Sequence, residues 1–208
     1  MLRRLLGCLP AAILLVSAAA AGQGSFPTLP VHVTVATHED APAVSEAWIR
    51  RQLRNANRLF NQHGVRFQLT DVAAMPERHA RLENRRDRHA LGAMLEDGRI
   101  DWFIVHSLRD VDEPERFRQG VHWRPRGEGY APRAHLVITS SIAGEHVLAH
   151  ELGHYFGNGH SDVPGNIMSY ERGEGPPFFD ETQVQRVRFS LRRFLRRGEI
   201  VGLPEVTE

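Results

Sequence analysis

The sequence has a single cysteine and no lysine. Cys8 lies in an apolar segment near the N-terminus, and every one of the 26 basic residues is an arginine. A single cysteine cannot form a disulfide within the chain. The stability of the folded chain must therefore come from its apolar core and from any metal that it binds.

Long apolar runs are scarce as well. Residues 5–16 form one such run after a short basic start, but it falls short of the roughly 20 residues that span a membrane. Small residues follow at positions 17–21, which completes the pattern of a cleavable secretory signal peptide. We predict this signal over residues 1–22, with export to the periplasm or outside the cell. The alternative is an uncleaved membrane anchor.

The chain also lacks an excess of either charge. Removing Arg3 and Arg4 with the signal leaves 24 basic against 25 acidic side chains. This balance gives no reason to expect nucleic acid or an anionic membrane surface as a partner, and we expect no stable membrane association. With 41% hydrophobic and 25% charged residues, residues 23–208 suit one soluble globular domain, which we expect to be a monomer.

Histidine is abundant, and residues 150–160 read H-E-L-G-H-Y-F-G-N-G-H. His150 and His154 are four residues apart, so on a helix they lie on the same face. Two imidazoles one turn apart can bind the same Zn²⁺ through nitrogens roughly 2.0–2.1 Å from the metal. Glu151 follows the first histidine and lies beside the metal, where a general base for a zinc-bound water is needed.

The rest of this segment extends the zinc hypothesis. Gly157 can adopt positive φ, end the helix and turn the chain so that His160 reaches the same metal. Three histidines leave the fourth tetrahedral position open for water, which is typical of a catalytic site. A core helix that is rich in histidine by chance is the alternative, but it explains neither Gly157 nor His160. His146 offers another ligand register, which would put Val147 where the glutamate is needed.

At these residues the sequence resembles the metzincin clan of zinc metalloendopeptidases. The pattern H-E-x-x-H-x-x-G-x-x-H and the methionine-containing turn at residues 166–170 carry the resemblance. It implies a general base at Glu151 and a turn at Met168 that lies beneath the metal. It also implies one catalytic Zn²⁺ with three ligands, which are His150, His154 and His160.

Two further residues relate the chain to different metzincins. Ser161, directly after the third histidine, resembles the matrixins, although no cysteine remains for a matrixin-type cysteine switch. Tyr170 resembles the astacins and serralysins, in which this tyrosine can ligate zinc or hydrogen-bond the oxyanion. We therefore leave the subfamily unassigned and treat Tyr170 as a candidate catalytic residue. The alternative for Tyr170 is a packed side chain with its hydroxyl in water.

The apolar pattern predicts an α+β fold. The resemblance implies a twisted mixed sheet with helices, an N-terminal subdomain over about 27–157 that contains the zinc helix, and a small irregular C-terminal subdomain over about 158–208. We expect Ser140 or Ser141 to cap the zinc helix. Strands are expected at 31–36, 65–69, 100–108 and 135–140, and helices at 43–61, within 77–97 and at 180–197.

A long connection at residues 109–132 contains one short strand-like segment. Metzincins carry an edge strand at this point, and an extended substrate pairs with it by β-augmentation. We assign that role to four residues, which are Val121, His122, Trp123 and Arg124. An ordinary surface loop with a buried Trp123 is the alternative.

The predicted function is that of an exported zinc-dependent endopeptidase with a protein or peptide substrate. Zinc polarises the scissile carbonyl and lowers the pKa of its bound water toward about 7. Glu151 accepts the proton of that water and passes it to the leaving amine. Two alternatives remain, a zinc hydrolase of cell-wall peptides and a non-catalytic zinc-binding module. The intact Glu151 argues against the second.

Overall fold

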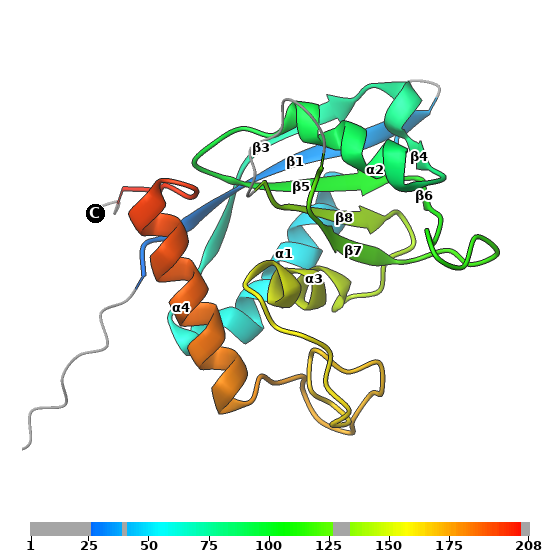
Figure 1. The fold of residues 1–208 in the computed structure, drawn as a ribbon. Coiled ribbons are helices and arrows are strands. Elements are labelled where there is room, and N and C mark those ends of the chain that lie inside the picture. Colours follow the sequence, from blue (N-terminus) through cyan, green and yellow to red (C-terminus); the bar gives the residue numbers. More distant parts are fainter. Residues whose placement is uncertain (1–25, 39–40, 127–133, 205–208) are drawn as a thin grey trace, which may run out of the picture.

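The structure of the chain, a computed structural model, describes residues 26–38, 41–126 and 134–204. The predicted signal peptide at residues 1–22 lies outside the described residues. Within them, a mixed sheet carries helices on both faces, so the predicted α+β fold class is confirmed (Figure 1).

The main sheet has six strands in the order β2-β1-β5-β8-β7, with β3 paired to β1. Strands β3, β1, β5 and β8 are parallel, whereas β7 runs antiparallel to β8. Among the described residues β7 lies at the edge of the sheet, one residue earlier than the predicted edge segment 121–124. The strands are β1 (Leu29–His38), β2 (Ala41–Pro42), β3 (Phe67–Met75), β5 (Ile100–Val105), β7 (Gly120–Trp123) and β8 (Leu136–Ser140).

The central strands are buried on both faces. In β5, Ile100, Trp102 and Ile104 belong to one core cluster, while Phe103 and Val105 belong to a second cluster on the other face. This alternation explains the nearly continuous apolar run in the sequence. The predicted strand 100–108 is divided, because a short strand β6 (Ser107–Leu108) leaves the main sheet and pairs with β4 (Arg81–Leu82).

Three helices share the larger core cluster, namely α1 (Glu46–Phe60), α3 (Val147–Tyr155) and α4 (Glu181–Arg197). In Figure 1 α1 and α3 lie beneath the sheet, and the short α2 (Arg85–Ala90) lies on the opposite side. The helix expected within 77–97 is confirmed, although it is much shorter than that segment. Two 3₁₀ turns, Glu77–His79 and Leu91–Met94, flank β4 and α2 there.

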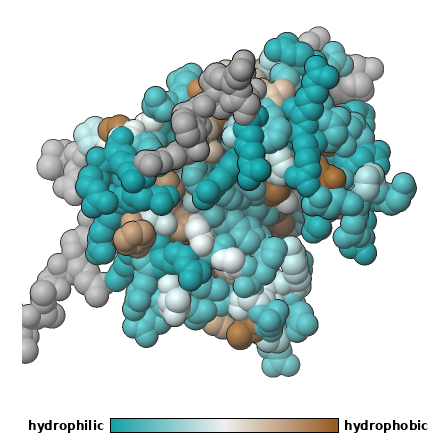
Figure 2. All heavy atoms as spheres, in the orientation of Figure 1, coloured by the Kyte–Doolittle hydropathy of each residue, from teal (hydrophilic) through white to brown (hydrophobic). Residues whose placement is uncertain are grey.

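The side of the molecule drawn in Figure 2 is covered mostly by hydrophilic residues, with hydrophobic ones in small scattered groups. No helix in the described part of the chain combines the length and the apolar character needed to cross a membrane.

Candidate metal centre

Helix α3 carries the first two histidines of the motif, and it begins later than the sequence suggested. Strand β8 continues through Ser140, and a turn at residues 141–146 separates it from the helix. The N-cap is His146, whose side chain makes no capping hydrogen bond. The predicted cap at Ser140 or Ser141 is therefore wrong. Ser141 instead donates its hydroxyl to the carbonyl oxygen of His106 at 3.3 Å.

The end of α3 follows the prediction. Gly157 has a φ of 94°, a conformation that side-chain-bearing residues rarely adopt. Its N–H donates to the carbonyl of His154 at 2.9 Å, and the N–H of Asn158 donates to the carbonyl of Gly153 at 3.0 Å. This pair of bonds is a Schellman motif. It turns the chain so that His160 returns to the face of the helix that carries the other histidines.

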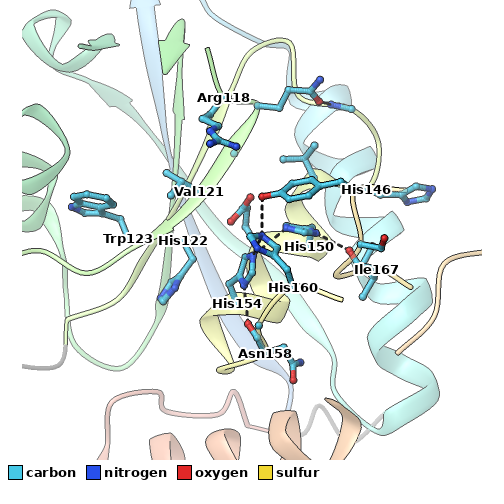
Figure 3. Close-up of a pocket in the computed structure, with 18 of the residues that line it drawn as sticks. Arg118, Val121, His122, Trp123, His146, His150, His154, Asn158, His160 and Ile167 are labelled. Atoms are coloured by element: carbon cyan, nitrogen blue, oxygen red, sulfur yellow. Dashed lines mark hydrogen bonds between the residues drawn. The ribbon is translucent and has the colours of Figure 1, made fainter. Parts of the chain in front are cut away.

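Three ring nitrogens converge at this point (Figure 3). The Nε2 atom of His154 lies 3.1 Å from Nε2 of His150 and 3.1 Å from Nε2 of His160. Nδ1 of His150 lies 2.7 Å from the carbonyl oxygen of Ile167, and Nδ1 of His154 lies 2.7 Å from that of Asn158. A carbonyl oxygen can only accept, so both Nδ1 atoms are donors.

These tautomers fit a metal ion. With the proton on Nδ1, the Nε2 atoms of His150 and His154 carry lone pairs that face each other, and a shared cation removes their repulsion. Two nitrogens bound to one tetrahedral zinc are about 3.4 Å apart, close to the spacing found here. Burial lowers the pKa of His150 and lowers that of His154 to about 4. Burial thus favours the neutral form that binds metal.

The methionine turn supports the histidine-bearing helix from below. Met168 is fully buried, and its sulfur occupies the space that a side chain at Gly153 would take. The N–H of Met168 donates to the side-chain oxygen of Asn166 at 2.9 Å, and the side-chain amide of Asn166 donates to Gln183 of α4 at 2.8 Å. The turn is therefore fixed to both α3 and α4.

The side chain of Glu151 extends from α3 toward the edge strand β7. Its side chain is buried, and burial raises its pKa to about 8, although a hydrogen bond from the backbone N–H of His122 acts in the opposite direction. A metal ion at the histidines would lower this pKa. A methyl group at Gly120 would come within 2.9 Å of a Glu151 carboxylate oxygen. The absence of a side chain at Gly120 lets β7 approach the carboxylate this closely.

Tyr170 reaches the third histidine. Its hydroxyl oxygen lies 2.9 Å from Nε2 of His160, and the two ring centroids are 4.7 Å apart. The side chain is 70% exposed. The hydroxyl thus contacts a candidate metal ligand, and the catalytic role of Tyr170 stays a prediction.

The histidines open onto a cleft of about 1320 Å³ that β7 lines along one side. Trp123 is fixed there, because its Nε1–H donates to Nδ1 of His89 at 3.1 Å and the Arg88 guanidinium lies 4.9 Å from its ring centroid. The ring of His122 lies beside that of His135, with 2.9 Å between Nε2 and Nδ1. Val121 also lines the cleft, and Arg124 follows the end of β7.

The sequence matches no protein-family model, and no curated protein matches it. Mature mirolysin from Tannerella forsythia, solved with a cleaved peptide, matches with a TM-score of 0.56 and 13% identity over 85% of this chain and 99% of that one. Archaemetzincin from Methanopyrus kandleri matches with a TM-score of 0.51 and 17% identity, covering 80% of this chain and 97% of that one.

Metalloproteinase-II from Bacteroides fragilis matches with a TM-score of 0.53 and 16% identity over 81% of this chain. The match covers 55% of that protein, so this chain spans about half of its length. The chain has the fold of these metallopeptidases. The predicted metzincin-like architecture, a twisted mixed sheet with helices, is confirmed at the level of the fold.

The structure thus brings the predicted histidines, Glu151, Met168 and Tyr170 together, and it adds Arg118. This residue precedes β7 by two positions and lines the same cleft. Burial and, to a smaller extent, the charge of Arg118 lower the pKa of His160, and the same charge opposes the rise that burial causes in the pKa of Glu151. No sequence pattern marks Arg118, because it lies in an aperiodic connection and its contact with Asp110 forms only in the folded loop.

Proposed function

We propose that the chain is a zinc-dependent endopeptidase, acting as a monomer with one metal ion. One observation carries this proposal, namely the convergence of three Nε2 atoms beside the buried carboxylate of Glu151. Two of the imidazoles are oriented by backbone carbonyls, as metal-binding histidines usually are. The fold shared with mirolysin, which was solved with a cleaved peptide, supports a peptide substrate.

The ligands in this proposal are His150, His154 and His160. A zinc ion bound there would polarise the scissile carbonyl and lower the pKa of a bound water. Glu151 takes the proton from the attacking water and delivers it to the leaving amine. The hydroxyl of Tyr170 can donate to the carbonyl oxygen as negative charge develops on it.

The edge strand β7 supplies the substrate platform in this proposal. Its partner β8 occupies one side only, so the other side can pair with an extended peptide. The start of β7 at Gly120 lies against the side chain of Glu151. A peptide held along β7 would therefore pass directly by the proposed base.

Export remains part of the proposal. Residues 1–22 have the pattern of a cleavable signal peptide, followed by a catalytic domain at 23–208. Expression of the full-length chain in a bacterium with fractionation tests it. The expected result is a protein outside the cytoplasm whose N-terminus lies near residue 23, and a full-length cytoplasmic protein would contradict it.

The catalytic assignment is tested with purified protein and a peptide library. Wild type should cleave peptides and lose activity with a zinc chelator. Glu151→Gln should lower kcat by about 10²–10⁴-fold or more with zinc retained, because it removes the proton acceptor but no ligand. Tyr170→Phe should cost at most about 10²–10³-fold.

Glu46→Gln is the matched control, since Glu46 is exposed on α1, pairs with Arg50 and lies outside the cleft lining. It should leave kcat within about twofold, as expected for a surface change. Turnover by Glu151→Gln equal to that of the wild type would overturn the mechanism. A parallel digest of peptidoglycan fragments tests the cell-wall alternative, which cleavage of these fragments alone would support.

A further inference from the structure

We propose that Arg118 binds a carboxylate of the peptide substrate close to the scissile bond, so that the cleft selects acidic peptides. This inference rests on the proposed endopeptidase function and specifies its substrate class.

The position of Arg118 is set by a buried acid. Asp110 is 3% exposed, and one of its oxygens accepts the backbone N–H groups of Asp112 and Glu113 at 2.8 and 3.1 Å. The other oxygen accepts Nε–H of Arg118. The backbone hydrogen bond from Asp112 has the largest effect in lowering the pKa of Asp110. With the bond from Glu113 and the contact with Arg118, it lowers this pKa to about 2. The acid stays ionised and holds the guanidinium in place.

The arrangement leaves one edge of the guanidinium group available. The Asp110 contact uses Nε, and no described residue forms a hydrogen bond with the two terminal nitrogens of Arg118. The side chain is 42% exposed at the cleft. A fork of two N–H donors matches the two oxygens of a carboxylate. Because the fork is held in advance, little side-chain entropy is lost on binding.

Arg118 lies close to the reaction centre. It precedes Gly120 by two residues, a separation of about 7 Å in extended chain, and Gly120 itself lies against Glu151. Figure 3 shows Arg118 beside the start of β7 on the side of the three histidines. An extended peptide paired with β7 would therefore bring a side chain near the scissile bond to this guanidinium.

The charges around the cleft favour an acidic partner. Two of its lining acids are already paired, Asp112 with Arg85 and Glu145 with His146. Besides Asp110 and Glu151, the lining then offers one more acid, Glu171. Four further arginines line the cleft, which are Arg88, Arg124, Arg126 and Arg172. With Arg85 and Arg118 the lining holds six arginines against five acids, so a peptide carboxylate would enter a site of slight positive charge.

Binding measured without turnover tests this inference. In the Glu151→Gln background, fluorescent peptides that carry Glu or Gln at each position in turn are titrated against the protein. We expect Glu to bind about five- to tenfold more tightly than Gln at one position, as for a partly exposed, preorganised ion pair. Adding salt should reduce this ratio. Peptides with a free or an amidated C-terminus distinguish a terminal carboxylate from a side chain.

Substitutions at Arg118 test whether this residue causes the preference for Glu over Gln. Adding Arg118→Gln should bring the Glu-to-Gln ratio to about one, whereas Arg116→Gln, on the same loop but outside the cleft lining, should preserve it. Arg118→Lys keeps the charge but loses the fork, so its ratio should be intermediate. Zinc content and thermal melting check that each variant is folded. A ratio unchanged by Arg118→Gln, or no preference for Glu at any position, would overturn the proposal.

The two proposals can fail separately. If the wild type cleaves none of these peptides while the Glu preference depends on Arg118, the endopeptidase function is wrong and the carboxylate site stands. If the wild type cleaves Glu and Gln peptides equally well and binds them equally, the endopeptidase stands and Arg118 has no role in selection.

Discussion

Helices α3 and α4 pack in the same core but are built differently. Helix α4 has 17 residues, a capping box between Asp180 and Gln183, and a left-handed Gly198 after its last turn. Helix α3 has nine residues and no side-chain cap at its N-terminus. A helix as short as α3 is not stable by itself in water. The comparison shows that local sequence defines α4, whereas tertiary contacts must define the helix that carries the candidate metal ligands.

Helix α1 supplies part of those contacts. The buried Gln52 donates its side-chain amide to the carbonyls of Ala143 and Gly144 at 3.2 and 3.1 Å. Asn55 donates in the same way to the carbonyl of Glu145 at 3.0 Å. The turn that leads into α3 is thus anchored from a neighbouring helix. Such support from packed elements is what holds a ligand set at fixed geometry.

The largest expected effect concerns the metal. His154→Ala removes the central ligand of the three, so zinc should be lost on dialysis. Zinc present at about a thousand times its Kd stabilises a folded protein by roughly 4 kcal/mol, and this contribution should disappear. Metal analysis and thermal melting with and without chelator measure it. Stoichiometric zinc in the variant would show that α3 does not hold the metal through this residue.

The glycines that end α3 and α4 provide a second test of the difference between the two helices, with an effect of intermediate size. Gly157 and Gly198 both follow a helix with positive φ, 94° and 69°. Space is not limiting, since an added Cβ would approach no atom closer than 3.5 Å at Gly157 and none within 4 Å at Gly198. Alanine at either position should therefore destabilise the fold by about 1–2 kcal/mol through backbone strain alone.

Zinc affinity and peptide cleavage should differ between the Gly157→Ala and Gly198→Ala variants. Gly157→Ala shifts the chain that leads to His160, so zinc affinity and peptide cleavage should both fall. Gly198→Ala should leave them at the wild-type level. Denaturant unfolding, zinc titration and a cleavage assay measure the three quantities. Equal zinc affinity in both variants would mean that the end of α3 does not position the third ligand.

The same contrast explains what the sequence could predict. Helix α4 was located to within one residue, because Asp180 and Gly198 act on their immediate neighbours. The candidate ligands were found because their spacing is itself the signal. The start of α3 was placed wrongly, since its anchors, Gln52 and Asn55, lie about 90 residues away in sequence.

Arg118 was missed for a related reason. Nothing in the residues around it marks a functional position, and its orientation follows from the buried Asp110. The sequence pattern also misses β4 and the pairing of β6 with it, because each strand has only two residues and the pairing depends on the tertiary fold. Local patterns thus predict most of the larger elements and the candidate metal ligands, while the walls of the cleft required the structure.

The smallest expected effects come from substitutions at the N-terminal ends of helices α4 and α3. The side chain of Asp180 accepts from the N–H of Gln183 at 2.8 Å, and the side chain of Gln183 accepts from the N–H of Asp180 at 2.9 Å. Asp180→Ala removes this cap and should lower the free energy of unfolding by about 1 kcal/mol. Zinc affinity should change little, because α4 contacts the methionine turn through Gln183 and the end of α3 through Phe194, and loss of the cap leaves both contacts in place.

His146→Ala is the counterpart at α3. His146 occupies the N-cap position without a capping hydrogen bond, and its partly exposed side chain pairs with Glu145. An exposed pair of this kind contributes little to stability, so the free energy of unfolding should change by less than about 0.5 kcal/mol. Zinc should stay bound, because His146 is not among the three converging histidines. Denaturant titrations of the two variants side by side provide the measurement. If His146→Ala destabilised the protein as much as Asp180→Ala, α3 would have a local cap after all, and the distinction between the two helices would fail.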